Sequence, residues 1–244
     1  MEKVGTLQSI TRYPVKAMGG ETLEKCMMHL CGLQGDRSHA FLDLSRPGEY
    51  LTANNYPTLF RYTARFDVVK EGQETAERLI VTAPDGQSYE WGDSSLLRRL
   101  EQETNRSLGY KSFESNTIGA NSEDHILIAS ESSLREISRL WGQGNMDPRR
   151  FRVNWCIALD CDTPFKEETW VGKQIVVGET VLDVNKCCKR CFYVNINPET
   201  ATIDPSVLKT IVRQRSNCFG VYASVVKKGT NYQSESVYVA DALY

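Results

Sequence analysis

The sequence is poor in the features that mark membrane, secreted and disulfide-rich proteins. No window approaches the roughly 18 consecutive apolar residues of a membrane-spanning helix, so we expect no membrane association. The first residues, MEKVG, show no basic segment followed by an apolar run, so we expect no secretory signal. Only 8 of the 244 residues are cysteine, too few for a disulfide scaffold. These absences predict a cytoplasmic protein with reduced thiols.

An excess of charge of one sign is also missing. Lys and Arg number 29, Asp and Glu number 31, and the net charge is −2. Proteins that bind nucleic acid through its phosphates carry a basic excess, so we expect no nucleic-acid partner. A small anionic ligand needs only a local group of cations and is therefore compatible with this balance.

Several familiar catalytic motifs are absent as well. The sequence contains no glycine-rich dinucleotide fingerprint, no phosphate-binding P-loop, no HExxH zinc motif and no GxSxG nucleophile elbow. The three histidines lie far apart, at no paired spacing. The function therefore has to be inferred from other patterns.

The sequence does contain a succession of short strands separated by turn residues. Mixed apolar and polar segments bounded by Gly, Pro and Asp predict strands at residues 4–10, 24–30, 39–44, 60–69 and 78–83. The same signals recur at residues 151–159, 174–177, 181–185, 221–227 and 236–240, with a hairpin turn at 177–180. Many short strands at this spacing are typical of a barrel or a sandwich.

Three segments have helical spacing instead, at residues 94–103, 131–141 and 206–214. Asp93 or Ser94, Ser130 and Asp204 are their candidate N-caps. The fold class is therefore α+β and β-rich. The loosest stretch is 114–124, rich in Ser, Asn and Gly, so we divide the chain into a first domain of residues 1–115 and a second of residues 116–244.

The densest group of reactive side chains is at residues 186–191, which read KCCKRC. Positive charge beside a thiol favours its thiolate, which can act as a nucleophile, a sulfur carrier or a metal ligand. A zinc site is poorly supported because the chain has no second C-x-x-C. A thioredoxin-like pair is poorly supported because we expect residues 192–196 to be β-type rather than helical. An inert core cysteine is the remaining alternative.

Other short segments combine cations with tight turns. Residues 149–154 read RRFRVN, residues 13–20 read YPVKAMGG, residues 35–37 read GDR and residues 195–200 read NINPET. The forked guanidinium of arginine suits a phosphate, and asparagine can donate to the edge of a heterocycle. Each segment taken alone is equally compatible with a solvated face or a plain turn.

Taken in order along the chain, these motifs resemble the MOSC family. The family is named for the C-terminal domain of molybdenum cofactor sulfurases and includes the mitochondrial amidoxime-reducing component. Residues 188–200, CKRCFYVNINPET, are similar to its C-x-R-C signature segment, and residues 164–170 and 219–222 are similar to further family segments. The resemblance covers nearly the whole chain. It implies an N-terminal β-barrel-like region packed on a MOSC β-barrel with a few helices.

The resemblance also implies a molybdenum cofactor, Mo-molybdopterin, bound between the two parts. By the same resemblance, Cys191 is the catalytic residue and the molybdenum ligand, and Lys16 and Arg37 hold the anionic end of the cofactor. Further cofactor-side positions are Ser130, Arg152, Asn154, Lys189 and Arg190. A soft thiolate suits a soft metal, and a phosphate suits Lys and Arg. The chain departs from the family pattern at Ala17, Arg150, Val153 and Ala201.

The activity implied by the resemblance is that of a molybdenum-dependent oxidoreductase that reduces N-hydroxylated or N-oxide small molecules. Two alternatives stay open: a sulfur-transfer protein with a persulfide on Cys191, and a non-catalytic module that binds or carries the cofactor. The sequence has no nucleotide fingerprint and no plant-type [2Fe–2S] cysteine pattern. We therefore expect a separate ferredoxin- or flavin-type protein to donate electrons.

Overall fold

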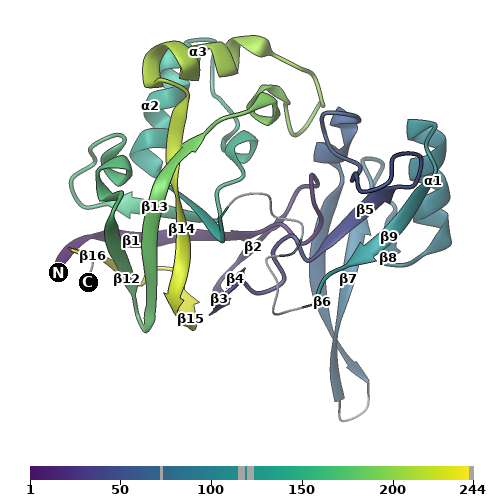
Figure 1. The fold of residues 1–244 in the computed structure, drawn as a ribbon, viewed down its shortest axis with the longest axis horizontal. Helices are drawn as coiled ribbons and strands as arrows, with labels where there is room; N and C mark the ends of the chain where they lie inside the picture. The colour runs from purple at the N-terminus through teal and green to yellow at the C-terminus, as the bar shows by residue number, and fades with distance from the viewer. Residues whose placement is uncertain (72–73, 115–118, 120–123, 242–244) are drawn as a thin grey trace.

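The computed structural model describes residues 1–71, 74–114, 119 and 124–241, with the backbone alone at 69–71 and 74–76. Two groups of elements lie side by side (Figure 1). One is a β-barrel with two helices against it, and the other is a smaller group of sheets with one helix. The predicted β-rich α+β fold with a closed barrel is confirmed.

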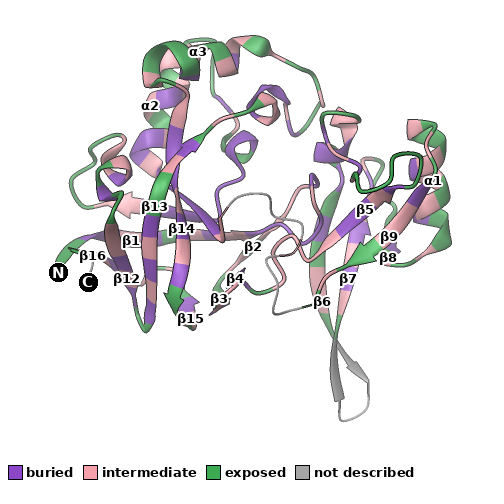
Figure 2. Cartoon of the chain, in the orientation of Figure 1, coloured by how far each residue is buried: buried purple, intermediate pink, exposed green. Residues whose placement is uncertain are grey.

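Seven strands close the barrel. In spatial order these are β11 (Trp155–Leu159), β10 (Ile126–Ser130), β14 (Cys218–Lys227), β13 (Thr180–Lys189), β12 (Lys173–Val177), β16 (Ser236–Asp241) and β1 (Glu2–Arg12). Pairing of β1 with β11 completes the ring, and β2 (Glu21–Leu23) extends β1 outside it. Apolar side chains such as Leu7, Trp155 and Leu182 fill the interior and are fully buried. Figure 2 shows the resulting alternation of buried and half-buried residues along the first half of β13.

The barrel contains the first strand of the chain. Strand β1 pairs with β16, so the N-terminus and Asp241, the last described residue, lie at the same end of the barrel (Figure 1). A second link joins β3 (Lys25–His29) to β15 (Gly229–Tyr232), with β4 (Gly32–Leu33) beside β3. The proposed division between residues 115 and 116 lies outside the described residues and stays a prediction.

The smaller group is built from local hairpins and one helix. Its elements are β5 (His39–Asp43), η1 (Pro57–Arg61), β6 (Thr63–Glu71), β7 (Glu74–Thr82), β8 (Ser88–Glu90), α1 (Ser94–Thr104) and β9 (Leu108–Ser112). Strand β5 pairs with β9, and β7 pairs with both β6 and β8. Phe41, Tyr62, Leu96 and Leu100 pack together in a core separate from that of the barrel.

The three predicted helices are confirmed, with the expected caps. Helix α2 (Glu131–Trp141) begins where the hydroxyl of Ser130 accepts from the N–H of Ser133, and it ends at the left-handed Gly142. Asp93 caps α1, and Asp204 caps α3 (Pro205–Arg215). None of the described helices is long and apolar enough to cross a bilayer.

Most predicted strands form, but two strand predictions were too long and one segment was predicted wrongly. Residues 57–61 form η1 before β6 begins, and residues 148–151 form η2 (Pro148–Phe151) before β11 begins. The predicted β-type segment 192–196 is wrong, because it forms a 3₁₀ turn, η4 (Phe192–Asn195). The amide oxygen of Asn195 accepts from the N–H of Leu208 in α3 (2.9 Å), a tertiary bond that holds this turn. The predicted hairpin turn at 177–180 is confirmed between β12 and β13.

Candidate functional site

Two loops from different parts of the sequence meet where β1 ends. The N–H of Arg37 donates to the carbonyl of Tyr13 (2.7 Å), and the N–H of Tyr13 donates to Oδ1 of Asp36 (2.7 Å). Residues 35–37 are therefore fixed against the loop that carries Lys16. These two hydrogen bonds, one between main-chain groups and one to the Asp36 carboxylate, hold the GDR and YPVK motifs next to each other.

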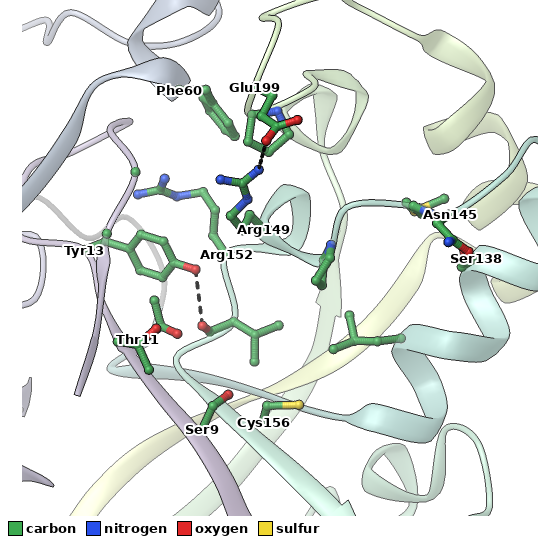
Figure 3. Close-up of a pocket in the computed structure, with 18 of the residues that line it drawn as sticks. Ser9, Thr11, Tyr13, Phe60, Ser138, Asn145, Arg149, Arg152, Cys156 and Glu199 are labelled. Carbon is green, nitrogen blue, oxygen red and sulfur yellow. Dashed lines mark hydrogen bonds and ion pairs between the residues drawn. The ribbon is translucent and has the colours of Figure 1, made fainter. Parts of the chain in front are cut away.

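The ring of Tyr13 has two guanidinium groups beside it. The Cζ atom of Arg152 lies 4.2 Å from the ring centroid and that of Arg37 lies 5.0 Å from it. Nη1 of Arg152 donates to the carbonyl of Met18 (2.5 Å), and the Tyr13 hydroxyl donates to the carbonyl of Val153 (3.3 Å; Figure 3). These contacts join the first loop of the chain to the segment that precedes β11. We call the region where these two segments and residues 35–37 meet the junction.

Three residues of this junction have a left-handed backbone that L-residues rarely adopt. The φ angles are 65° at Ala17, 48° at Arg37 and 53° at Arg152. Each such residue costs on the order of 1 kcal/mol, and residues of this kind cluster at functional sites. The departure at Ala201 has the same geometry, with φ of 58°, and lies in the turn after η4.

The cations at the junction act on one another. Burial, followed by the charges of Arg37 and Arg152, lowers the pKa of Lys16. Burial, followed by the charge of Arg37, lowers the pKa of Arg152 to about 10. Burial by itself would lower the pKa of Arg37, but the charge and hydrogen bond of Asp36 outweigh it and raise that pKa.

Asn154 supports the junction from the barrel side. Its Oδ1 accepts from Nη1 of Arg37 (3.2 Å) and from the N–H of Leu127 (3.2 Å). Its Nδ2 donates to the carbonyl of Thr11 (3.1 Å). The side chain is almost fully buried, and these three bonds orient the Arg37 guanidinium.

Cys191 lies at the start of η4 with its side chain exposed, directly after β13. Its neighbour Arg190 is anchored: Nη2 donates to the carbonyl of Phe151 (2.8 Å), and Nη1 donates to Sγ of Cys188 (2.9 Å). The buried Nε of Arg190 has no hydrogen-bond partner among the described residues. Arg190 acts electrostatically on the Tyr13 hydroxyl, as Arg37 and Arg152 do, so it belongs to the same cluster.

Two predicted site residues lie elsewhere. Ser130 is fully buried, and its hydroxyl donates to Glu167 (2.9 Å) while capping α2, so its described partners are not junction residues. Lys189 donates to the carbonyl of Ser216 (2.9 Å) beside the start of β14. Their proposed roles at the cofactor stay predictions.

A cavity of about 1230 Å³ opens between the two groups of elements. It is lined by residues of β1, by Phe60 and Thr63 from the smaller group, and by α2 and the segment after it. Figure 3 shows Arg149 at this cavity, paired with Glu199. Tyr13 and Arg152 line the cavity and also belong to the junction, whereas Cys191 does not line it.

Several junction residues were not among the predicted site residues. Tyr13 lies inside the YPVK motif and Asp36 inside the GDR motif, so their place in these motifs could have marked them as site residues. Arg150, noted only as a departure, donates through Nη1 to the carbonyl of Val194 (3.1 Å) and so supports η4 next to Cys191. The hydroxyl of Tyr222 interacts with Cys188 and with the charge of Arg190, and no local pattern marked it.

With this geometry in place, comparisons with known proteins identify the family. The sequence family described as the MOSC domain matches residues 103–244, and the family described as the MOSC N-terminal beta barrel domain matches residues 4–130. The chain belongs to the MOSC family. The resemblance inferred from the motifs is thereby confirmed.

The curated relatives match only in part. Molybdenum cofactor sulfurase of Drosophila persimilis is 28% identical over 151 residues, which are 60% of this chain and 18% of that protein. Mitochondrial amidoxime reducing component 2 of Bos taurus is 27% identical over 126 residues, which are 46% of this chain and 36% of that protein. The chain thus matches less than a fifth of the sulfurase. These relatives connect the chain to proteins named for molybdenum cofactor or amidoxime reduction.

Among solved structures, the YuaD protein of Bacillus subtilis has the same fold. The TM-score is 0.52 at 13% sequence identity, and the match covers 98% of this chain and 97% of the other. This likeness supports the architecture and carries no information on activity. No group of three or more His, Cys, Asp or Glu side chains suited to a metal ion is present among the described residues.

Proposed function

We propose that this protein binds the molybdenum cofactor at the junction and reduces N-hydroxylated or N-oxide compounds. The observation that carries the proposal is the buried guanidinium of Arg152, which lies in the same junction as Lys16 and Arg37. Arg152 is 8% exposed, and no described carboxylate lies within 4.0 Å of it. A buried, unneutralised guanidinium is costly to the fold unless a ligand supplies the opposite charge.

The residues present fit a phosphate-bearing, molybdenum-containing group. Lys16, Arg37 and Arg152 act on one another electrostatically, as converging donors for a single anion do. The buried Nε of Arg190, the residue before Cys191, has no hydrogen-bond partner among the described residues and is a candidate further donor. A cysteine thiolate is a ligand of the soft type that suits such a metal. One protein ligand to the metal requires no larger cluster of metal-binding side chains.

Each residue would have a defined task. Lys16, Arg37 and Arg152 would bind the anionic end, with Asn154 orienting the Arg37 guanidinium. Cys191 would bind the metal, and Arg190 would fix the backbone beside it through its bond to Phe151. When bound, the cofactor supplies the two-electron chemistry that cleaves an N–O bond. The chain supplies binding, orientation and charge balance.

Electrons would come from a second protein. Two electrons are needed for each N–O bond cleaved, and the sequence has no pyridine-nucleotide fingerprint. We expect the purified chain to be inactive with NADH or NADPH alone and active with an artificial reductant such as reduced viologen. Turnover driven by NADH without another protein would contradict this part of the proposal.

The decisive experiment compares two exposed cysteines. The protein would be produced in a host that makes the cofactor, and molybdenum, pterin and viologen-driven reduction of a hydroxylamine or amidoxime would be measured. Cys191→Ala is expected to lower the turnover by at least about 100-fold, because the metal loses its protein ligand. Cys161→Ala, which removes another exposed thiol, is expected to leave turnover unchanged.

Two outcomes would contradict the proposal. Wild-type turnover in the Cys191→Ala variant would show that the ligand assignment is wrong. Bound molybdenum and pterin without turnover on any N–O substrate would instead favour a carrier module.

A sulfur-transfer function is the second candidate, and the match to molybdenum cofactor sulfurase favours it. In this case Cys191 would carry a persulfide, for which an exposed thiol is required. Mass spectrometry after incubation with a sulfur donor would show one added sulfur atom on Cys191. A persulfide on Cys191 in protein that binds no molybdenum would favour this function over reduction.

A further inference from the structure

A pair of thiols lies outside the site described above. Cys187 is on β13, and Cys218 begins the neighbouring antiparallel strand β14. The register places Lys189 opposite Cys218 and Cys187 opposite Val221. Residues opposite one another in a sheet point to the same face, as do residues two apart along a strand. The side chains of Cys187 and Cys218 therefore share one face at the end of the strand pair.

A β-bulge in β14 interrupts the regular pairing of the two strands at this point. Between two paired positions β13 advances by two residues, whereas β14 advances by three, so β14 has one extra residue. Gly220 lies in this part of β14 and has φ of 73°. A Cβ at this position would lie 2.7 Å from the carbonyl oxygen of Ile128, so only glycine fits. Cys218 is among the groups that raise the pKa of Cys187, which agrees with the register in placing the two thiols near one another.

The adjacent cysteine is excluded from this pair. Cys188 is 1% exposed, packs under the helices and accepts a hydrogen bond from Arg190. Cys187 and Cys218 are both half-buried, which leaves them within reach of a small reagent. Cys188, the first cysteine of the C-x-x-C spacing, is therefore not a member of the thiol pair that we consider here.

We propose that Cys187 and Cys218 are a dithiol that is converted to an intramolecular disulfide by exchange with a small-molecule disulfide. One thiolate attacks the reagent RSSR, forming a mixed disulfide and releasing RS⁻. The second thiolate attacks the protein sulfur of that mixed disulfide, forming the Cys187–Cys218 bond and releasing a second RS⁻. The two thiols lose two protons and two electrons, and the reagent is reduced to two thiolates.

The surroundings determine the rate of this exchange. Burial, followed by the charge of Glu168 and by Cys218, raises the pKa of Cys187 to about 11. Glu168 is itself paired with Arg215 (2.6 Å), so its carboxylate stays beside the thiol. Since only the thiolate attacks, the Cys187 step limits the exchange at neutral pH. The bond would tie β13 to β14 four residues before Cys191.

The test uses purified full-length protein and glutathione disulfide, with thiols labelled before and after reduction and peptides mapped without reduction. The expected product is a Cys187–Cys218 cross-link within the monomer, which dithiothreitol reverses. Oxidised protein is expected to melt roughly 5 to 10 °C higher than reduced protein, because the bond closes a loop of about thirty residues. The result does not depend on a bound cofactor.

Variants distinguish the pair from general thiol oxidation. Cys187→Ser is expected to leave Cys218 as the mixed disulfide with glutathione and to remove the gain in melting temperature. Cys31→Ser, which changes another half-buried cysteine, is expected to form the cross-link as wild type does. Circular dichroism would confirm that each variant is folded. If Cys161 is glutathionylated while no Cys187–Cys218 peptide forms, or if Cys218 links to Cys191 instead, the proposal is wrong.

Discussion

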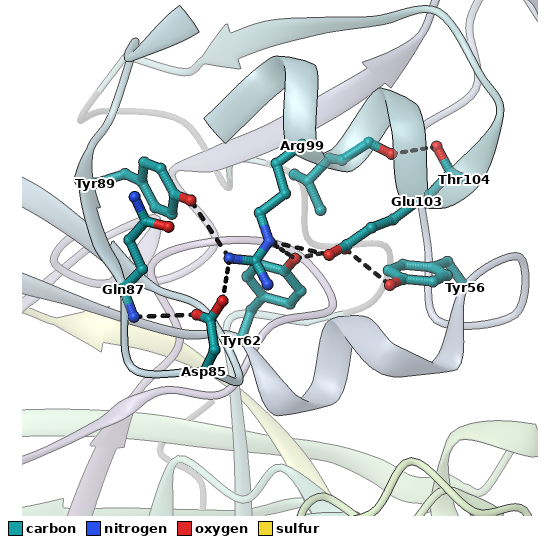
Figure 4. Close-up of polar contacts among 9 residues, drawn as sticks. Tyr56, Tyr62, Asp85, Gln87, Tyr89, Arg99, Glu103 and Thr104 are labelled. Carbon is teal, nitrogen blue, oxygen red and sulfur yellow. Dashed lines mark hydrogen bonds and ion pairs between the residues drawn. The ribbon is translucent and has the colours of Figure 1, made fainter. Parts of the chain in front are cut away.

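Two clusters of arginine and tyrosine in this molecule differ in how their charge is balanced. In the smaller group of elements, Arg99 of α1 donates to Glu103 (3.0 Å), to Asp85 (2.7 Å) and to the hydroxyl of Tyr62 (3.1 Å; Figure 4). Glu103 also accepts from Tyr62 (2.5 Å) and from Tyr56 (2.9 Å). Two carboxylates face one guanidinium, and the network holds α1 against the neighbouring turns.

The junction has the opposite balance. Arg37 is paired with Asp36, but no described carboxylate lies within 4.0 Å of Arg152 or Arg190. Their described partners are carbonyls, a thiol and aromatic rings. A balanced network stabilises the fold by itself, whereas the charge of Arg152 would be neutralised by the anionic ligand proposed above. The difference predicts opposite consequences for the same kind of substitution.

The largest expected effect tests ligand binding at the junction. Arg152→Met is expected to lower bound molybdenum and pterin by at least about tenfold, because a charged hydrogen bond contributes roughly 1.5 to 3 kcal/mol. Both contents would be measured after gel filtration of protein made in a cofactor-competent host. Arg213→Met, at an exposed position of α3 away from the cavity, should retain wild-type content. Equal losses of molybdenum and pterin in both variants would mean that the cofactor does not bind specifically at the junction.

The next effect concerns stability in the balanced network. Arg99→Met is expected to lower the free energy of unfolding by about 1 to 3 kcal/mol, because Glu103 and the buried Tyr62 each lose a hydrogen-bond partner. Urea denaturation would measure the change. The neighbouring Arg98 is exposed, so Arg98→Met should stay within about 0.5 kcal/mol of wild type. An unchanged stability in Arg99→Met would show that the network contributes nothing.

A smaller effect sharpens the contrast between the clusters. In cofactor-free protein, Arg152→Met is expected to change the free energy of unfolding by less than about 1 kcal/mol, or to increase it. The variant loses one hydrogen bond to Met18 but also removes a buried, unneutralised charge. The same urea experiment checks it. A loss as large as that of Arg99→Met would imply that the junction is balanced in a way its contacts do not indicate.

The last effect, which is absent at neutral pH, is a pH dependence at His39, whose carbonyl accepts from the N–H of Lys16 (2.9 Å) and whose ring packs on Trp91. Burial lowers the pKa of His39 to about 4, below its value of about 6.5 in an unfolded chain. Its contribution to stability is therefore complete above pH 6.5 and is lost as the pH falls towards 4. His39→Gln should flatten the fall in melting temperature across this window. An unchanged slope would contradict the assignment.

Local interactions explain what could be predicted from the sequence. The capped helices at 94–104, 131–141 and 205–215 form as expected, because caps and helical spacing act within a few residues. The hairpin at 177–180 depends on the two strands that flank it and on Gly178. The family could be predicted because its motifs are short, ordered segments. Cys191 was identified in this way, and its role at the metal is still a prediction.

Contacts between distant segments were decided only by the tertiary structure. Pairing of β1 with β11 and β16 closes the barrel, and no local pattern specifies that register. The turn at 192–195 has the composition of a strand, yet its bond to α3 and the contact of Arg150 hold it as a 3₁₀ turn. In the KCCKRC segment the sequence shows the C-x-x-C spacing of Cys188 and Cys191 and gives no sign of a link to Cys218. The bulge in β14 that contains Gly220 puts Cys187 and Cys218 on the same face of the sheet, because side-chain direction in a sheet follows the register between strands.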